Sequence, residues 1–244
     1  MANKYVGDGI QADRGAWTFG GDTSKNFDSH VSKSVPLYEE GHQLICDISD
    51  YFVKSDSVVY EIGCSTGTLT YKVAEHNKHK EGARFIGTDV VDEMLQAAEE
   101  KRPHIPGADK INIQFVKDDV IQTELEPCDM IICYYTVQFI HPSIRQAVID
   151  KFYQALNWGG ALLLFEKVRG ADARFQDILT GLYTDYKLRM GYTPEDIVGK
   201  SLSLKGVLEP FSSRGNIEML ERAGFCDINT VQKYICFEGF LAIK

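Results

Sequence analysis

A short stretch near the first quarter of the chain has residue types and spacing that suit two different chemistries. The letters GCSTG at 63–67 match G-x-S-x-G, the turn that presents the nucleophilic serine of many hydrolases. The same stretch follows an apolar segment at 57–62 and precedes a helical run at 67–76, which is the setting of a cofactor-binding glycine turn. Ser65 is therefore either a nucleophile or a small residue beside a ligand.

A hydrolase would need an acid and then a histidine, later in the chain, to activate Ser65. The histidines are His30, His42, His76, His79, His104 and His141. Residues 142–244 contain no imidazole, so the region that should supply the base has none. Ser65 is accordingly interpreted as a turn residue, and the histidines are assigned no role.

An acidic residue at the end of the next predicted strand favours a cofactor site. Asp89 lies 22 residues beyond Gly67, close to the ~20 expected for a carboxylate that binds ribose hydroxyls. Ser65 stands where the G-x-G-x-x-G motif has the glycine that lets a pyrophosphate approach the backbone. Glu61 adds negative charge beside the turn. S-adenosylmethionine has a ribose, an ammonium and a sulfonium but no phosphate, so it is the expected cofactor.

The composition is that of a globular chain with an acidic balance. Of the 244 residues, 44% are hydrophobic, which predicts a substantial core. The net charge of −9 argues against a duplex nucleic-acid partner, because such binding depends on clustered Lys and Arg. The six cysteines form no C-x-x-C pair, so reduced thiols, a cytoplasmic location and no metal site are expected. No segment has the apolar length of a signal peptide or a membrane span, so no membrane partner is expected.

Alternating strand and helix patterns must position these residues. Strands are predicted at 57–62, 84–89, 111–116, 129–135 and 161–167, with helices between them at 67–76, 91–102 and 143–157. The chain ends in a predicted helix and two strands, a hairpin that would close the sheet. The patterns predict an α/β fold with a doubly wound, mostly parallel, seven-stranded Rossmann-like sheet.

Two segments lie outside this alternation. Residues 1–54 are expected to form an N-terminal arm, extended over 1–30, followed by a helix that starts near residue 35. Residues 171–208 are expected to be a helical insertion over the carboxyl edge of the sheet. Its apolar stripe, expected to pack inward, contains Phe175, Ile178, Leu179, Leu182, Tyr183, Tyr186 and Met190. No linker or repeat interrupts the chain, so residues 1–244 are expected to form one domain.

Together these motifs resemble those of class I S-adenosylmethionine-dependent methyltransferases. EIGCSTG is similar to their first motif, GTDVV to the acid of their second strand, and KDDV to their adenine-contacting loop. A longer series resembles the bacterial carboxy-S-adenosylmethionine synthases, which make the carboxylated cofactor used in tRNA wobble-uridine modification. It consists of AWTF, SVPLY, EIGCSTGTLT, TVQFI, RQAVIDKFYQALNWGGALLLFEK, MGYT and AGF, and runs from about Trp17 almost to the C terminus.

The turn and the resemblance together predict which residues contact the cofactor. They are Tyr38, Glu61, Gly63, Cys64, Ser65, Gly67, Asp89, Val90, Asp119, Val120 and Tyr134. The resemblance places the first of these at the methionine end of the cofactor, the pair at 89 and 90 at the ribose and adenine, and the pair at 119 and 120 beside the base. Since Tyr134 and Tyr135 both end the fourth predicted strand, alternation predicts that only Tyr134 faces the site.

Two positions differ from the pattern of the synthases. Tyr134 replaces an asparagine, and Ser201 replaces an arginine that holds the added carboxylate of the product. A buried carboxylate without that cation would be costly to hold, and Lys200 is the adjacent candidate for a substitute.

Three functions are compatible with these observations. The first is a methyltransferase that aligns its cofactor with a small-molecule methyl acceptor, with Tyr134 and Glu166 as the catalytic candidates. The second is a carboxy-S-adenosylmethionine synthase with a different grip on the carboxylate. The third is a cofactor-binding protein without catalysis. A homodimer is compatible with all three.

Overall fold

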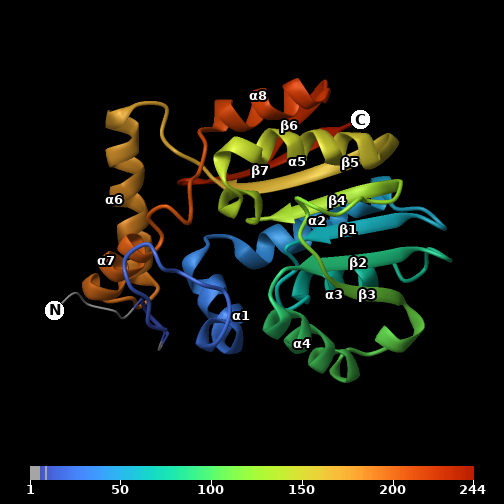
Figure 1. Ribbon diagram of the computed structural model, residues 1–244, viewed down its shortest axis with the longest axis horizontal. Coiled ribbons are helices and arrows are strands. Elements are labelled where there is room, and N and C mark those ends of the chain that lie inside the picture. Colours follow the sequence, from blue (N-terminus) through green and yellow to red (C-terminus); the bar gives the residue numbers. More distant parts are fainter. Residues whose placement is uncertain (1–5, 9) are drawn as a thin grey trace.

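A seven-stranded sheet forms the centre of the molecule (Figure 1). This computed structural model describes residues 6–8 and 10–244. The strands are β1 (Val58–Ile62), β2 (Arg84–Asp89), β3 (Asn112–Lys117), β4 (Cys128–Tyr134), β5 (Leu156–Lys167), β6 (Asp227–Tyr234) and β7 (Phe237–Ile243). Their order is β3-β2-β1-β4-β5-β7-β6, and β7 runs antiparallel to both of its neighbours while the pairs among β1 to β5 are parallel. The predicted doubly wound sheet and its closing hairpin are confirmed.

Helices cover both faces of the sheet. They are α1 (Asp22–Ser34), α2 (Tyr38–Phe52), α3 (Thr68–His76), α4 (Asp92–Lys101), α5 (Pro142–Ala155), α6 (Ala173–Arg189), α7 (Pro194–Ser203) and α8 (Ser213–Ala223), with short 3-10 turns at Arg102–His104, Ala108–Lys110 and Val137–Phe139. Within the described part of the chain, no helix is long and apolar enough to cross a membrane.

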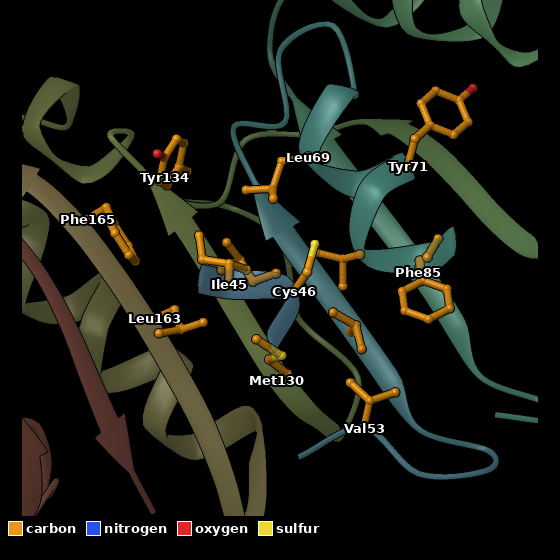
Figure 2. Packing of buried hydrophobic residues seen from close by; sticks show 14 of the residues in the cluster. Ile45, Cys46, Val53, Leu69, Tyr71, Phe85, Met130, Tyr134, Leu163 and Phe165 are labelled. Carbon is orange, nitrogen blue, oxygen red and sulfur yellow. The ribbon is translucent and has the colours of Figure 1, made fainter. Parts of the chain in front are cut away.

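The two faces of the sheet support separate apolar cores. Met130 and Leu163 point to the face covered by α2 and α3, where they pack with Ile45 (Figure 2). Ile131 and Leu162, their neighbours along β4 and β5, point to the opposite face, which α5 and α8 cover. Burial on both sides explains why these central strands are almost wholly apolar.

The N-terminal segment differs from the predicted extended arm. Residues 22–34 form the helix α1, so the prediction is wrong for 22–30, and residues 1–5 and 9 lie outside the described residues. The polar and glycine-rich composition hid a short amphipathic pattern, in which Phe27 and Val31 are four residues apart on one face. Val31 packs on the core beside α2, so tertiary packing overrides the weak local preference.

The segment predicted as an insertion forms α6 and α7, which stand beyond the carboxyl ends of the parallel strands (Figure 1). Its predicted stripe does not pack as one unit. Leu179 and Tyr183 contact the core, whereas the exposed members are Phe175, Ile178, Leu182 and Met190. The predicted stripe spans a wide arc of the helix, whereas α6 contacts the core along a narrow face, so the apolar residues at the sides of the stripe stay exposed.

A buried arginine joins the loops that border the carboxyl edge of the sheet. Arg145 on α5 is only 2% exposed. Its guanidinium donates to the carbonyl oxygens of Ile140 at 2.7 Å, Glu209 at 2.6 Å and Gln138 at 2.8 Å, and it lies over the ring of Phe211. The fork geometry of the side chain therefore holds two loops that are distant in sequence.

Replacement of Arg145 by methionine should strongly destabilise the fold. The variant keeps much of the side-chain volume but leaves three buried carbonyl oxygens without their donor, so the free energy of unfolding should fall by about 3 kcal/mol. Urea denaturation followed by circular dichroism measures this. Arg214→Met is the matched control, because that side chain is 87% exposed and pairs with Glu218 on the same helix. Equal stability of the two variants would contradict the role of Arg145.

Candidate functional site

A cavity of about 800 Å³ opens at the carboxyl edge of the parallel strands. Its walls come from the turn after β1, the ends of β2, β4 and β5, and the helices α1, α6 and α7. The volume is within the ~300–1,000 Å³ range of small-molecule sites, and the position is where doubly wound sheets bind their ligands.

The turn after β1 is built around glycine and a carboxylate. Gly63 has a φ of 70°, and any side chain there would collide with Thr136, so this position requires glycine. The backbone N–H of Ser65 donates to Asp89 at 2.9 Å, and the N–H of Val91 donates to the same carboxylate at 2.9 Å. Asp89 thus shapes the turn and also lines the cavity.

Ten of the eleven predicted cofactor contacts line this one cavity. They are Tyr38, Glu61, Gly63, Cys64, Ser65, Asp89, Val90, Asp119, Val120 and Tyr134. Gly67 is not among the lining residues. A Cβ atom there would lie 2.6 Å from Phe115 and 3.0 Å from Ala98, so this glycine allows close packing of the turn on its neighbours.

The predicted adenine-side loop is held in place from α5. Lys151 donates to the carbonyl oxygens of Val120 at 2.7 Å, Ile121 at 3.0 Å and Thr123 at 2.7 Å. Asp119 accepts the N–H of Ile121 at 3.0 Å. On the facing loop, Val90 exposes 58% of its surface while lining the cavity, which is suitable for packing on a flat base.

Glu61 places a carboxylate in the cavity without a cation beside it. Its side chain is buried and accepts a hydrogen bond from Thr70. Burial raises the pKa of Glu61 to about 8, and the nearby Asp89 carboxylate raises it further while the hydrogen bonds from Thr70 oppose the shift. A ligand with a positive charge would favour the ionised form of Glu61, whereas a phosphate would be repelled.

Aromatic rings close the cavity near α2. The rings of Tyr38 and Tyr134 lie 5.1 Å apart, and His42 packs against both. The Tyr134 hydroxyl donates to the carbonyl of Tyr38 at 2.7 Å and occupies the space above Gly41, where a side chain would collide with it. Tyr134 therefore fixes the start of α2 as well as lining the site.

Tyr135 also lines the cavity, contrary to the prediction that only Tyr134 would. β4 ends at Tyr134, and Tyr135 adopts a left-handed backbone with a φ of 61°. Alternation of side chains holds only within extended backbone, so it fails at this position.

Glu166, one of the two catalytic candidates, is not part of the cavity wall. It is 1% exposed, and its carboxylate accepts hydrogen bonds from the backbone of Val137 and Gln138. Burial raises the pKa of Glu166 to about 8. The side chain supports the loop that carries Tyr135, since Gln138 in turn donates to the Tyr135 carbonyl at 3.1 Å.

Four lysines border the cavity on the side of α6 and α7, and one of them, Lys205, is exposed. The lysine group consists of the other three: Lys167 at the end of β5, Lys187 on α6 and Lys200 on α7. Both Lys167 and Lys187 lie over the ring of Tyr183, with Nζ 4.5 Å and 4.6 Å from its centre. Among residues 6–8 and 10–244, none of the three forms an ion pair with a carboxylate.

The lysine group is held in an environment that disfavours its charge. Burial and then the neighbouring Lys167 lower the pKa of Lys187 to about 7. Burial also lowers the pKa of Lys167, and burial together with Lys187 holds the pKa of Lys200 well below its ordinary value. An anionic ligand would relieve this unfavourable arrangement.

Lys187 and His30 line the cavity, although few features of the sequence indicated them. One signal was present for Lys187, because it continues the four-residue spacing of Leu179 and Tyr183 along the face of α6 that turns inward. His30 carried no comparable signal, since its helix was not predicted. No group of three His, Cys, Asp or Glu side chains in the described ranges could hold a metal ion.

Comparison with solved structures and family models agrees with this geometry. A family described as a methyltransferase domain matches residues 60–162. The structure is similar to that of an O-methyltransferase family 2 protein from Planctomyces limnophilus, with a TM-score of 0.63 and 16% identity over 92% of this chain and 62% of the other. The class I methyltransferase fold expected from the motifs is confirmed.

Two curated relatives match nearly the whole chain. A carboxy-S-adenosyl-L-methionine synthase from Staphylococcus epidermidis is 39% identical over 229 residues, covering 93% of this chain and 97% of the relative. A protein of the same name from Nautilia profundicola is 34% identical over 218 residues, covering 89% and 90%. S-adenosyl-L-methionine is the cofactor of this chain. The residues of the cavity fit this molecule, because Glu61 offers a carboxylate to a positive charge and the turn at Ser65 lacks the glycine that a pyrophosphate needs.

Binding of S-adenosyl-L-methionine should strengthen as the pH rises from 6 to 8. The cofactor is positively charged and prefers ionised Glu61, whose pKa is about 8 in the protein, so low pH requires that a proton be removed on binding. Calorimetry should show affinity rising about tenfold over this range. In Glu61→Gln the same measurement should give weaker binding with little dependence on pH, and an unchanged slope would exclude Glu61 as the cause.

Proposed function

Because the chain belongs to the carboxy-S-adenosyl-L-methionine synthase family, we propose that it adds a carboxyl group to the methyl group of S-adenosyl-L-methionine. The match to the Staphylococcus epidermidis protein covers 93% of this chain and 97% of the relative. It therefore includes the insertion as well as the cofactor turn. A carboxyl donor, a carboxylic acid that gives up its carboxyl group, is the second substrate that this reaction requires.

The observation that carries the proposal is the lysine group. The reaction creates a carboxylate beside the sulfonium, and a buried carboxylate needs a cation or several hydrogen-bond donors. The resemblance to the synthases implies an arginine where Ser201 stands, and Ser201 supplies a hydroxyl in its place. Lys167 and Lys187 border the same part of the cavity through their shared contact with Tyr183. Their positive charge takes the place of the missing guanidinium.

The residues of the chain divide the work around the ligand. When bound, S-adenosyl-L-methionine supplies a methyl group whose C–H bonds are weakened by the adjacent sulfonium. Glu61 provides negative charge for the cationic end of the cofactor. The rings of Tyr38 and Tyr134 offer electron-rich faces, which typically stabilise a cation by ~0.5–2 kcal/mol. Lys167 and Lys187 hold the carboxylate that the reaction creates, and α1, α6 and α7 form part of the cavity wall.

A second candidate is a methyltransferase that acts on a small molecule. Two features favour it: Ser201 replaces the arginine of the synthases, and the hydroxyl of Tyr134 is already bonded to the Tyr38 carbonyl. Such an enzyme would use the lysine group to hold an anionic methyl acceptor.

The mass of the bound nucleoside separates these candidates. Protein purified after expression should yield a cofactor heavier than S-adenosyl-L-methionine by one carboxyl group. Lys187→Met should lower the amount of the carboxylated form at least tenfold, because a hydrogen bond to a charged group contributes ~1.5–3 kcal/mol. Ser201→Arg, alone or with Tyr134→Asn, should increase its retention by a similar factor.

Lys78→Met is the matched control, because Lys78 is 60% exposed, pairs with Glu75 and does not line the cavity. It should leave the bound nucleoside unchanged. If the unmodified protein carries only S-adenosyl-L-methionine or S-adenosylhomocysteine, and forms no carboxylated product with any carboxylic acid supplied, the methyltransferase becomes the better candidate.

A further inference from the structure

A chain of hydrogen bonds leads from the N-terminal segment into the cavity. Asp8 lies 2.7 Å from Nδ1 of His30, and Nε2 of His30 lies 2.5 Å from Nζ of Lys200. His30 and Lys200 both line the cavity, at the side where the lysine group gathers. The three residues come from three separate parts of the chain: the segment before α1, α1 itself and α7.

The surrounding contacts hold this arrangement in one geometry. Asp8 also accepts hydrogen bonds from Lys33 at 2.9 Å and from the hydroxyl of Tyr192 at 2.8 Å. Trp17 stacks on His30 with ring centres 5.8 Å apart, and Nζ of Lys200 lies 3.3 Å from the centre of a Trp17 ring. The imidazole and the amine therefore have little freedom to turn away from each other.

The protonation state of His30 follows from its neighbours. Burial and then the charge of Lys200 lower the pKa of His30 to about 4, so the ring is neutral at neutral pH. Although burial opposes it, the hydrogen bonds from Lys33, Tyr192 and His30 keep the pKa of Asp8 below its ordinary value. An ionised Asp8 accepts a hydrogen bond from the Nδ1–H of His30, which leaves the lone pair on Nε2 to accept a hydrogen bond from the Lys200 amine.

Opposing forces act on the charge of Lys200. Burial, Lys187 and Lys167 favour the neutral amine, whereas Asp8 and the face of Trp17 favour the ammonium. A cation–π contact contributes ~0.5–2 kcal/mol, which corresponds to a change of about 0.4–1.5 in pKa. Lys200 is thus able both to accept a proton and to release it, unlike an exposed lysine.

We propose that Lys200 removes a proton from the methyl group of the bound cofactor, and that Asp8 and His30 position it for this step. The inference rests on the proposed function, because carboxylation replaces one methyl C–H bond by a C–C bond. The C–H electron pair forms the new bond to the carboxyl carbon of the donor, and the lone pair of the Lys200 amine takes the proton. The donor carbon keeps the electron pair of the bond it loses and receives the proton from Lys200, so that no net acid is produced.

Exchange of the cofactor's methyl hydrogens with deuterium in heavy water tests this role directly, without a carboxyl donor. The unmodified protein should exchange them, and Lys200→Met should slow exchange about a hundredfold or more, as expected for loss of a general base. The affinity for S-adenosyl-L-methionine, measured by calorimetry, should stay within about threefold. Exchange at the same rate in both proteins, or in neither, would overturn the proposal.

The pH dependence separates proton transfer from a structural role. Exchange should slow as the pH falls, because the neutral amine is the active form. Asp8→Asn removes a charge that raises the pKa of Lys200, so the midpoint should move to lower pH. His30→Phe keeps the ring stack with Trp17 but removes the acceptor of the Lys200 amine, so it should slow exchange about tenfold or more and also move the midpoint to lower pH. A midpoint that is the same in Asp8→Asn, or an unchanged rate in His30→Phe, would contradict these assignments.

Failure of this inference is distinguishable from failure of the proposed function. If Lys200→Met still accumulates the carboxylated cofactor at the rate of the unmodified protein, another group removes the proton and the inference is wrong while the function stands. If methyl exchange depends on Lys200 but no carboxylated product forms with any donor, the function is wrong and the proton transfer stands.

Discussion

Burial of charged groups without protein partners is the constraint on which the cavity depends. Glu61 lies on one side of it with no cation beside it, and the lysine group lies on another with no carboxylate paired to it among the described residues. Removing such charges from water is costly, so burial raises the pKa of Glu61 and lowers the pKa values of the lysines, which favours the neutral forms. A ligand that is cationic at one end and anionic at the other restores both kinds of pair. The buried charges of the cavity wall thus determine which end of the ligand is cationic and which is anionic.

The fold maintains this separation of charge by drawing the cavity from different layers. The cofactor turn and Glu61 belong to the first half of the sheet, while Lys187 and Lys200 come from helices that stand beyond its edge. α1 lies between them and supplies His30. Arg145 ties together the loops that carry Tyr135 and the segment after α7, so the two halves cannot drift apart without exposing its carbonyl partners.

Much of the cofactor-turn side of the cavity could be predicted, because its residues are close together in the sequence. Gly63, Ser65 and Asp89 belong to one strand–turn–helix–strand unit, and the ends of neighbouring parallel strands must meet at one edge. The other side could not be predicted in the same way. Whether Lys187 faces the cavity depends on the tilt of α6, and the left-handed backbone of Tyr135 depends on the loop held by Gln138 and Glu166. Neither is a property of the neighbouring residues in the chain.

The sequence by itself determined the order of strands and helices, the parallel sheet, the glycine turn and the acid that ends β2, because periodicity and turn chemistry act over a few residues. Only the tertiary structure decided that residues 22–34 form a helix, that Glu166 lies behind the wall, and that Asp8, His30 and Lys200 meet. Desolvation and hydrogen bonding between distant segments depend on the whole packing, and these set the charges of the site.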